Sequence, residues 1–228
     1  MKRKIVRGWL QILIGLAVFA YGVHLTISAG IGLAPWDCLG TGISNHTPFN
    51  YGVVMTGVAV IVLIIDLLLR ERIGCGTVID ALFTGNAVQF FNDRDPFSNI
   101  FLPLIKGKDA GVVVYAALIL ILMAGLCFMA FGQFLYMRNG QGCGPRDSLL
   151  LGIGKRLPHC PIGIVEILLW AVVLLTGFLL GGPVGIGTII TTFGAGVAMQ
   201  LVFRLVRFEP RNIQHKSVKE TMAELLGT

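Results

Sequence analysis

The chain has 228 residues, of which 55% are apolar and only 13% are charged. A soluble domain carries about a quarter charged residues, so this composition excludes an ordinary soluble protein and indicates a polytopic helical protein in a lipid bilayer. Strict alternation of polar and apolar residues, which a transmembrane β-barrel requires, is absent. The formal net charge of +6 requires no nucleic-acid partner, because anionic lipid at the inner membrane surface attracts basic residues.

Six apolar segments predict transmembrane helices, because each is long enough, or in one case nearly so, to cross about 30 Å of hydrocarbon. The first segment follows a basic N-terminus, but it is longer than the apolar region of a signal peptide and reads as a retained span. The expected spans cover residues 8–28, 52–70, 75–91, 111–137, 161–181 and 186–208.

Lysine and arginine are distributed unevenly between the two ends of these spans. If the N-terminus is cytoplasmic, 15 of the 18 basic residues flank inner ends and 3 flank outer ends. This bias predicts that both termini are cytoplasmic. Near the C-terminus, SVKETMAELL (217–226) has capping-box spacing and an apolar face, which predict a short amphipathic helix on the inner surface or on the protein itself. A frayed tail is the alternative.

A glycine-rich motif follows the first expected span and occurs again after the fourth. GIGLAPWDCLGTG (30–42) aligns with GQGCGPRDSLLLG (140–152), and with the preceding span included, eleven of 28 positions are identical. After a one-residue insertion, 52–89 aligns with 163–200, with 13 of 38 positions identical. We call residues related by these offsets of 110 and 111 twins.

The chain therefore contains two copies of one three-span unit within a single membrane domain. Repeat 1 covers about residues 8–94, repeat 2 covers about 111–208, and a cytoplasmic tail follows at 209–228. Because three is an odd number, the second copy would enter the membrane from the opposite side. Inverted-topology repeats of this kind recur in secondary transporters.

The segments after the two motifs are too long for tight turns and too short to cross the membrane. PWDCLGTGIS and PRDSLLLGIG each predict one short half-helix, with proline in its first turn. Two half-helices dipping in from opposite faces would form a broken, re-entrant segment in each repeat and bring Asp37 and Asp147 toward the midplane. The glycines that would let the backbone turn there are Gly30, Gly32, Gly140 and Gly142.

The paired G-x-G-x-x-P-x-D motifs, with GxGT downstream, resemble those of the YczE/YyaS/YitT-type bacterial integral membrane proteins, and most closely the YczE-like branch. The resemblance covers about residues 8–208. It implies a multi-pass protein of the bacterial cytoplasmic (inner) membrane and brings no particular substrate. Arg146 occupies the variable position of the motif that holds Trp36 in the first copy, so the two copies would form chemically different sites.

Asp37 and Asp147 are the leading candidates for binding a substrate or an ion. A carboxylate within a membrane is costly and usually functional, and these two would handle a cation or a proton. The alternative is that each carboxylate only caps a short interfacial helix and complements its dipole. The presence of an aspartate in both copies does not distinguish between the two interpretations, because a repeat would preserve helix-capping residues as well as binding residues.

Glu166 lies within the fifth expected span, and its twin is Met55, so the repeat itself does not require a carboxylate there. An intramembrane glutamate is a functional candidate by default. The alternative is an internal ion pair with Arg146 or Arg156. The candidate binding residues are therefore Asp37, Asp147, Glu166, Arg146, Gly30, Gly32, Gly140 and Gly142.

Other polar residues have structural interpretations. Asp80 stands three residues after Thr77, which predicts a capping box at a helix start. Asp66 and Arg70 are four residues apart, which predicts a pair on a helix surface. Four side chains are expected to form hydrogen bonds between helices: His24, Asn86, Gln89 and Gln200.

We expect a small secondary transporter or facilitator of a small polar or ionic solute, with its site near the pseudo-twofold axis. The alternative is a non-transport membrane accessory or scaffold protein that supports a partner complex. We do not expect an enzyme, because no hydrolase, metalloprotease or nucleotide-binding motif is present. The five cysteines show no metal-binding spacing, so neither a metal nor a cofactor is expected. Six spans make a thin wall, which is why we consider a homodimer.

Overall fold

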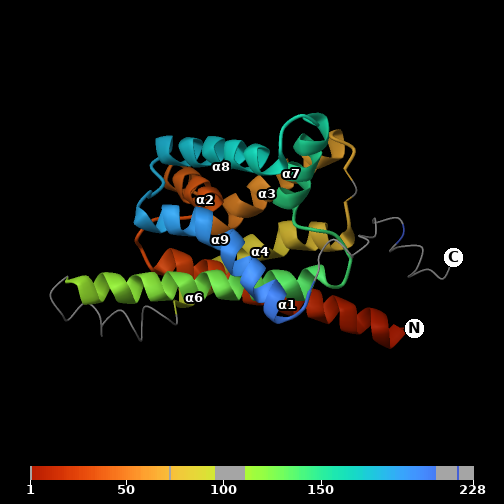
Figure 1. Ribbon diagram of the computed structural model, residues 1–228, viewed down its shortest axis with the longest axis horizontal. Helices are drawn as coiled ribbons and strands as arrows, with labels where there is room; N and C mark the ends of the chain where they lie inside the picture. The colour runs from red at the N-terminus through yellow and green to blue at the C-terminus, as the bar shows by residue number, and fades with distance from the viewer. Residues whose placement is uncertain (1, 72, 96–110, 209–219, 221–228) are drawn as a thin grey trace.

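The computed structural model describes the chain except for residues 1, 72, 96–110, 209–219 and 221–228 (Figure 1). Within the described residues the fold is entirely α-helical, with eight helices and no strand. The helices are α1 (Lys2–Ser28), α2 (Pro35–Asn45), α3 (Tyr51–Leu68), α4 (Cys75–Arg94), α6 (Val112–Met137), α7 (Pro145–Arg156), α8 (Ile162–Leu179) and α9 (Ile186–Leu205). The expected tail helix at 217–226 lies almost entirely outside the described residues.

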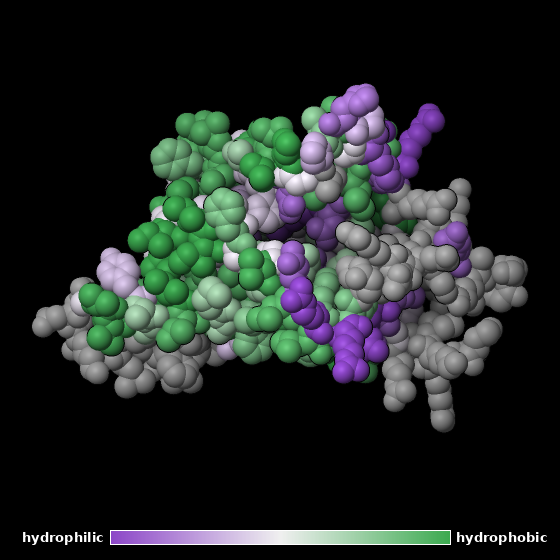
Figure 2. All heavy atoms as spheres, viewed as in Figure 1, coloured by the Kyte–Doolittle hydropathy of each residue, from purple (hydrophilic) through white to green (hydrophobic). Residues whose placement is uncertain are grey.

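Among the described residues, four stretches are long and apolar enough to cross a membrane: Gly8–Ser28, Tyr51–Leu68, Val112–Met137 and Ile186–Leu205. The apolar part of α8, Gly163–Leu179, is shorter, and α4 carries more polar side chains. The helices expose many large apolar side chains, and Figure 2 shows the largely apolar surface that results. An all-α membrane protein is therefore confirmed, while the count of six spans stays a prediction.

The helices form two outer layers with two helices between them (Figure 1). One layer consists of α1 and α6, which pack side by side. The other contains α2 against α8 and α7 against α3. Between the layers, α4 contacts α1 and α3, while α9 contacts α6. The contact of α1 with α4 in the first copy thus recurs as the contact of α6 with α9 in the second.

Glycines allow α1 and α6 to approach each other closely. A Cβ atom on Gly15 would lie 2.9 Å from the carbonyl oxygen of Gly132, and one on Gly22 would lie 2.7 Å from that of Gly125. Larger side chains would collide with the facing backbone, so small residues set the helix spacing here. Gly125 is the twin of Gly15 and Gly132 is the twin of Gly22, so the two contacts are twins of each other.

The two short helices begin at the prolines of the glycine-rich motifs, as the motifs predict. Pro35 opens α2 and Pro145 opens α7. The backbone before them turns through four glycines with positive φ, which are Gly30 (66°), Gly32 (121°), Gly140 (65°) and Gly142 (116°). This region of backbone conformation is costly for a residue that carries a Cβ atom, which explains glycine at these four positions.

Each glycine-rich motif is held by the GxGT turn of the other copy. The Gly187 N–H donates to the carbonyl oxygen of Ile31, and the Gly76 N–H donates to that of Gln141, both at 2.8 Å. Gly76 and Gly187 are twins, as are Ile31 and Gln141. The two copies therefore hold each other's motifs reciprocally.

The expected surface pair of Asp66 with Arg70 is wrong. The Asp66 side chain is fully buried, and neither of its carboxylate oxygens has a hydrogen-bond partner in the described structure. Arg70 lies just beyond α3 and adopts a left-handed backbone conformation with φ of 55°. The regular spacing that would bring the two side chains together on a helix face ends before Arg70.

The expected capping box is also wrong, because α4 begins at Cys75 with Gly74 as its N-cap. Thr77 therefore lies inside the helix, where its hydroxyl donates to the carbonyl oxygen of Cys143 at 2.6 Å. The expected hydrogen bonds between helices are confirmed for three of the four side chains, in the pairs His24–Asn92, Gln89–Gly52 and Asn86–Thr56. The fourth, Gln200, is exposed on α9.

Candidate functional site

A cavity of about 960 Å³ lies among the packed helices and is lined by residues from all eight of those described. Apolar and aromatic side chains form most of its wall. Figure 2 shows a hollow between α8 and α9 with hydrophilic residues inside it. A few polar groups in a largely apolar cavity are typical of a ligand-binding site, in which those groups orient the ligand.

Asp37 reaches the cavity from the first turn of α2. Its side chain is only 3% exposed, and its Oδ1 atom accepts a hydrogen bond of 2.8 Å from the hydroxyl of Tyr51. The N-cap of α2 is Ala34, and no side chain caps this helix or α7. The carboxylates of Asp37 and Asp147 therefore form no capping hydrogen bond, although both lie near a helix N-terminus, where the dipole favours negative charge.

Two further carboxylates meet at the start of α7. A Cβ atom on Gly144 would lie 2.9 Å from Oδ2 of Asp80 and 3.7 Å from Oδ2 of Asp147. The same Cβ atom would lie 3.5 Å from the hydroxyl oxygen of Tyr136. The missing side chain of Gly144 thus leaves room for two acidic groups, one from α4 and one from α7, on the cavity wall.

Arg146 supplies positive charge among these carboxylates. Its guanidinium carbon lies 5.0 Å from the centroid of the Trp36 ring, within the range of a cation–π contact. Within the described structure Arg146 forms no ion pair with Asp37, Asp80 or Asp147, so its positive charge acts on these three aspartates across longer distances. Trp36 and Arg146 are twins, so the side chains that the two motifs carry at this variable position contact each other.

Glu166 lines the cavity from α8 and is partly exposed. Within the described structure it forms no ion pair with Arg146 or Arg156, so the ion-pair interpretation is wrong. Its negative charge acts on Asp147 across the cavity. Burial of a carboxylate without a cationic partner is unfavourable unless a ligand, water or a proton compensates it.

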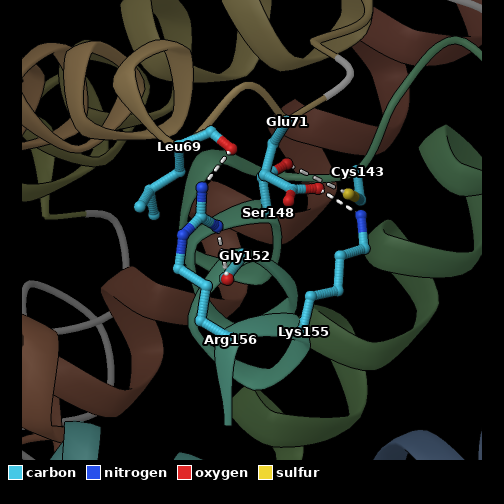
Figure 3. Close-up of polar contacts among 7 residues, drawn as sticks. All are labelled: Leu69, Glu71, Cys143, Ser148, Gly152, Lys155 and Arg156. Carbon is cyan, nitrogen blue, oxygen red and sulfur yellow. Dashed lines mark hydrogen bonds and ion pairs between the residues drawn. The ribbon is translucent and has the colours of Figure 1, made fainter. Parts of the chain in front are cut away.

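Arg156 is held elsewhere, at the C-terminal end of α7 (Figure 3). Its guanidinium donates to the carbonyl oxygens of Gly152, at 2.8 Å, and of Leu69, at 2.7 Å. Lys155 forms an ion pair with Glu71 beside it. These contacts satisfy terminal carbonyl groups of two helices and anchor α7 against the end of α3, while the first turn of α7 faces the cavity.

The structure thus brings Asp37, Asp147, Glu166 and Arg146 into one cavity. The four motif glycines are not among its lining residues, and they instead form the turns that lead into α2 and α7. Asp80 was missed as a site residue because its spacing from Thr77 suggested a cap. A signal was present, because the twin of Asp80 is Thr191, so the repeat does not require an acid there any more than at Glu166.

Within the described residues, no group of three or more His, Cys, Asp or Glu side chains is placed to hold a metal ion. The five cysteines are free thiols, and none of them lines the cavity. The functional groups on the cavity wall are therefore carboxylates, one guanidinium, hydroxyls, the Gln133 amide, methionine thioethers and aromatic rings.

A family model described as "Family of unknown function (DUF6198)" matches residues 6–73 and 95–204. An "Uncharacterized protein" of Haemophilus influenzae is 28% identical over 195 residues, which are 86% of this chain and 83% of that protein. The "Uncharacterized membrane protein YczE" of Bacillus subtilis is 28% identical over 203 residues, 88% of this chain and 87% of that protein. The "Uncharacterized protein YyaS" of the same species is 26% identical over 194 residues, which are 85% of this chain and 90% of that protein. The expected resemblance to YczE and YyaS is confirmed, and no solved structure matches the chain significantly.

Proposed function

The chain belongs to the family of unknown function DUF6198, and from its geometry we propose that it is a small secondary transporter or facilitator. It would move a small polar or ionic solute across the bacterial inner membrane. The observation that carries the proposal is an asymmetry between two helix hairpins, α3–α4 and α8–α9, that both line the cavity. The first hairpin is closed and the second is open.

We place the chain in the membrane as six spans in two inverted three-helix repeats, with both termini in the cytoplasm. The reciprocal contacts between α1 and α6, and between the motifs and the opposite turns, support a twofold relation between the copies. The excess of basic residues at one side supports the orientation. The lower hydropathy of α4 is compatible with a span, because polar residues such as Asp80 and Thr84 line the cavity rather than face lipid.

In the first copy, glycines bring α3 and α4 into contact. A Cβ atom on Gly52 would lie 3.0 Å from the carbonyl oxygen of Gly85 and 2.7 Å from the Cβ of Gln89. The Gly52 N–H also donates to Oε1 of Gln89 at 3.1 Å, which satisfies a donor that the first turn of a helix leaves unpaired. These three residues close the side of the cavity between α3 and α4.

The same three residues recur in the second copy, but there they are apart. Gly163 on α8 and Gly196 on α9 are the twins of Gly52 and Gly85, and a Cβ atom on either would meet no other atom within 4 Å. Gln200, the twin of Gln89, is exposed. Figure 1 shows that α8 and α9 diverge from their connection. The second hairpin therefore has the same two glycines and glutamine as the first, but its two helices are not in close contact there.

This asymmetry supports two alternative states of one cavity. With the N-terminus inside, the open end of α8–α9 faces the cytoplasm, and the contact of Gly52 with Gly85 closes the opposite side. In the second state, Gly163 would approach Gly196 while α3 and α4 separate, and the cavity would open outward. Exchange of conformations between inverted repeats around a central site is a general route to alternating access.

Distances between spin labels test this proposal without a known substrate. In a variant without native cysteines, one label pair is placed at Ile164 and Leu201 across α8–α9. The twin pair is placed at Val53 and Phe90 across α3–α4. All four side chains are exposed apolar groups away from the glycine contacts. We expect two distance populations for each pair in lipid nanodiscs, because each hairpin would alternate between the open and the closed form.

The alternative of a static accessory or scaffold protein predicts one distance for each pair, with α8–α9 always open. That outcome, obtained at several pH values and ion compositions, would remove the support for transport. A transporter further requires that the populations of the two pairs change together, because closing one hairpin accompanies opening of the other.

A further inference from the structure

We propose that this cavity takes lipophilic organic cations, in which an amine or quaternary ammonium group is attached to an apolar or aromatic body. The inference deepens the proposed function, on which it rests for the transport step. Binding of such a cation depends only on the chemistry of the cavity itself, which has three features: an excess of acidic groups, a single arginine that lies over a tryptophan ring, and an apolar wall open toward the membrane.

Acidic groups outnumber basic ones on the cavity wall. The lining residues include one guanidinium, that of Arg146, and four carboxyl groups, those of Asp37, Asp80, Asp147 and Glu166. If all of them are ionised, the wall carries a formal excess of three negative charges. A largely apolar wall screens such charge poorly, so carboxylates that are ionised there would attract cations and repel anions.

Arg146 is a weak anchor for an anionic group. Its guanidinium lies over the Trp36 ring, and it forms no ion pair with a carboxylate within the described structure. An anionic solute would have to approach this guanidinium against the charge of the three nearby aspartates, Asp37, Asp80 and Asp147. Glu166 likewise has no ion-pair partner in the described structure, and because it lies on the open α8–α9 hairpin it is the carboxylate best placed to meet a positive group.

The wall between the charged groups suits an apolar body. Aromatic faces attract cations, and the flexible thioether of methionine adapts to ligands of different shape. A cavity of about 960 Å³ is far larger than a dehydrated inorganic ion requires and lies within the range of sites for drug-sized molecules. The aromatic and methionine residues on the wall include Phe19, Tyr51, Met129, Tyr136, Trp170, Phe193 and Met199.

The open hairpin gives such a molecule a route from the bilayer. Ile167 on α8 and Phe193 on α9 both line the cavity, and they are 63% and 70% exposed. In a membrane, exposed apolar side chains at this position face acyl chains. A cation dissolved in the bilayer can therefore pass between α8 and α9 with its apolar body in contact with lipid or apolar side chains throughout.

Two ions of the same shape and opposite charge test the proposal. Binding of tetraphenylphosphonium and tetraphenylborate is measured by equilibrium dialysis against the full chain in lipid nanodiscs, with empty nanodiscs as the blank for partition into lipid. Tetramethylammonium serves as a cation without an apolar body. We expect saturable binding of tetraphenylphosphonium, and no saturable binding of either of the other two ions.

The carboxylate variants Glu166→Gln, Asp147→Asn and Asp80→Asn should each weaken tetraphenylphosphonium binding by about tenfold or more, because each removes one attractive charge from a poorly screened site. Asp93→Asn is the matched control: Asp93 is exposed at the end of α4, outside the cavity, and should leave binding unchanged. Melting temperatures close to that of the parent chain show that each variant is folded.

The proposed substrate class is refuted if tetraphenylborate binds as tightly as tetraphenylphosphonium. It is also refuted if the three cavity variants bind tetraphenylphosphonium with the same affinity as Asp93→Asn does. That failure would leave the proposed function standing wherever the spin labels still report two states. Conversely, charge-selective binding together with a single, fixed label distance would support the ligand class and refute transport.

Discussion

At the scale of single residues, two acidic groups of the cavity lie in an arrangement that is unfavourable for stability. Asp80 and Asp147 approach each other over the bare Cα of Gly144, and their negative charges repel. The repulsion is stronger in a poorly solvated cavity than in water. Groups held in such an unfavourable arrangement are common at functional sites, where a ligand relieves the cost.

Asp80→Asn should therefore raise the stability of the unliganded protein. The amide oxygen can still accept the hydrogen bond that the Thr84 hydroxyl donates to Asp80, whereas the buried charge is lost, together with its repulsion of Asp147 and its attraction to the more distant Arg146. We expect the melting temperature to rise by about 2 °C or more, since about 1 kcal/mol corresponds to about 2–4 °C in a domain of this size. Thermal unfolding of the variant and its parent in the same nanodiscs measures the shift. A lower melting temperature would show that the Asp80 charge stabilises the fold.

Most of the charged groups of the cavity can be predicted from the sequence, because a charge in an apolar span stands out and the repeat shows which charges the scaffold does not need. Glu166 stands out in this way, whereas the spacing of Thr77 and Asp80 suggests a helix cap although both residues lie inside α4, which begins at Cys75. The contacts that these charged groups make in space cannot be predicted from the sequence. The stacking of Arg146 on Trp36 depends on how two distant half-helices meet in space.

At the scale of elements, the two hairpins have the same closing residues and different conformations. The contact of Gly52 with Gly85 is tight, whereas Gly163 and Gly196 face open space. The alignment predicted the short helices and their glycine turns, because proline and positive φ are local requirements. It could not predict which hairpin is open, since identical residues at twin positions are compatible with both forms.

Gly196→Val should hold α8–α9 open without unfolding the protein. A valine fits the observed structure, where a Cβ at this position meets no atom within 4 Å, but it would collide with α8 in a closed hairpin. We expect the short-distance population between labels at Ile164 and Leu201 to disappear. The melting temperature should stay within about 3 °C of the parent value.

Two further variants complete this experiment. Gly52→Val should have the opposite effect, because its side chain would force α3 away from Gln89 and Gly85 and lengthen the α3–α4 distance. Gly57→Val is the control: Gly57 also faces open space, is exposed on α3 and lies outside the cavity. An unchanged distance distribution in both Gly52→Val and Gly196→Val would mean that the glycine contacts do not control the hairpins.

At the scale of the whole molecule, the repeat predicts a relation that local structure does not require. If the two copies are inverted, twins lie on opposite sides of the membrane. The contacts that α1 makes with α6, and that each motif makes with the opposite turn, are reciprocal, as a twofold relation requires. Composition alone suggested the membrane class, but only four of the six expected spans are apolar enough to be recognised by length and hydropathy within the described residues.

A pair of twin positions tests this relation directly. Cys160 precedes α8 and is an exposed free thiol, and its twin is Phe49, which is exposed just before α3. One variant keeps Cys160 as its only cysteine, and a second carries Phe49→Cys as its only cysteine. A membrane-impermeant maleimide should label Phe49→Cys in intact spheroplasts, because the excess of basic residues predicts that the start of α3 lies outside. Cys160 should be labelled only after the membrane is permeabilised.

Labelling of both thiols from the same side would refute the inverted repeat. Reversed labelling would keep the repeat and invert the orientation, in which case the open α8–α9 hairpin would face the outside of the cell.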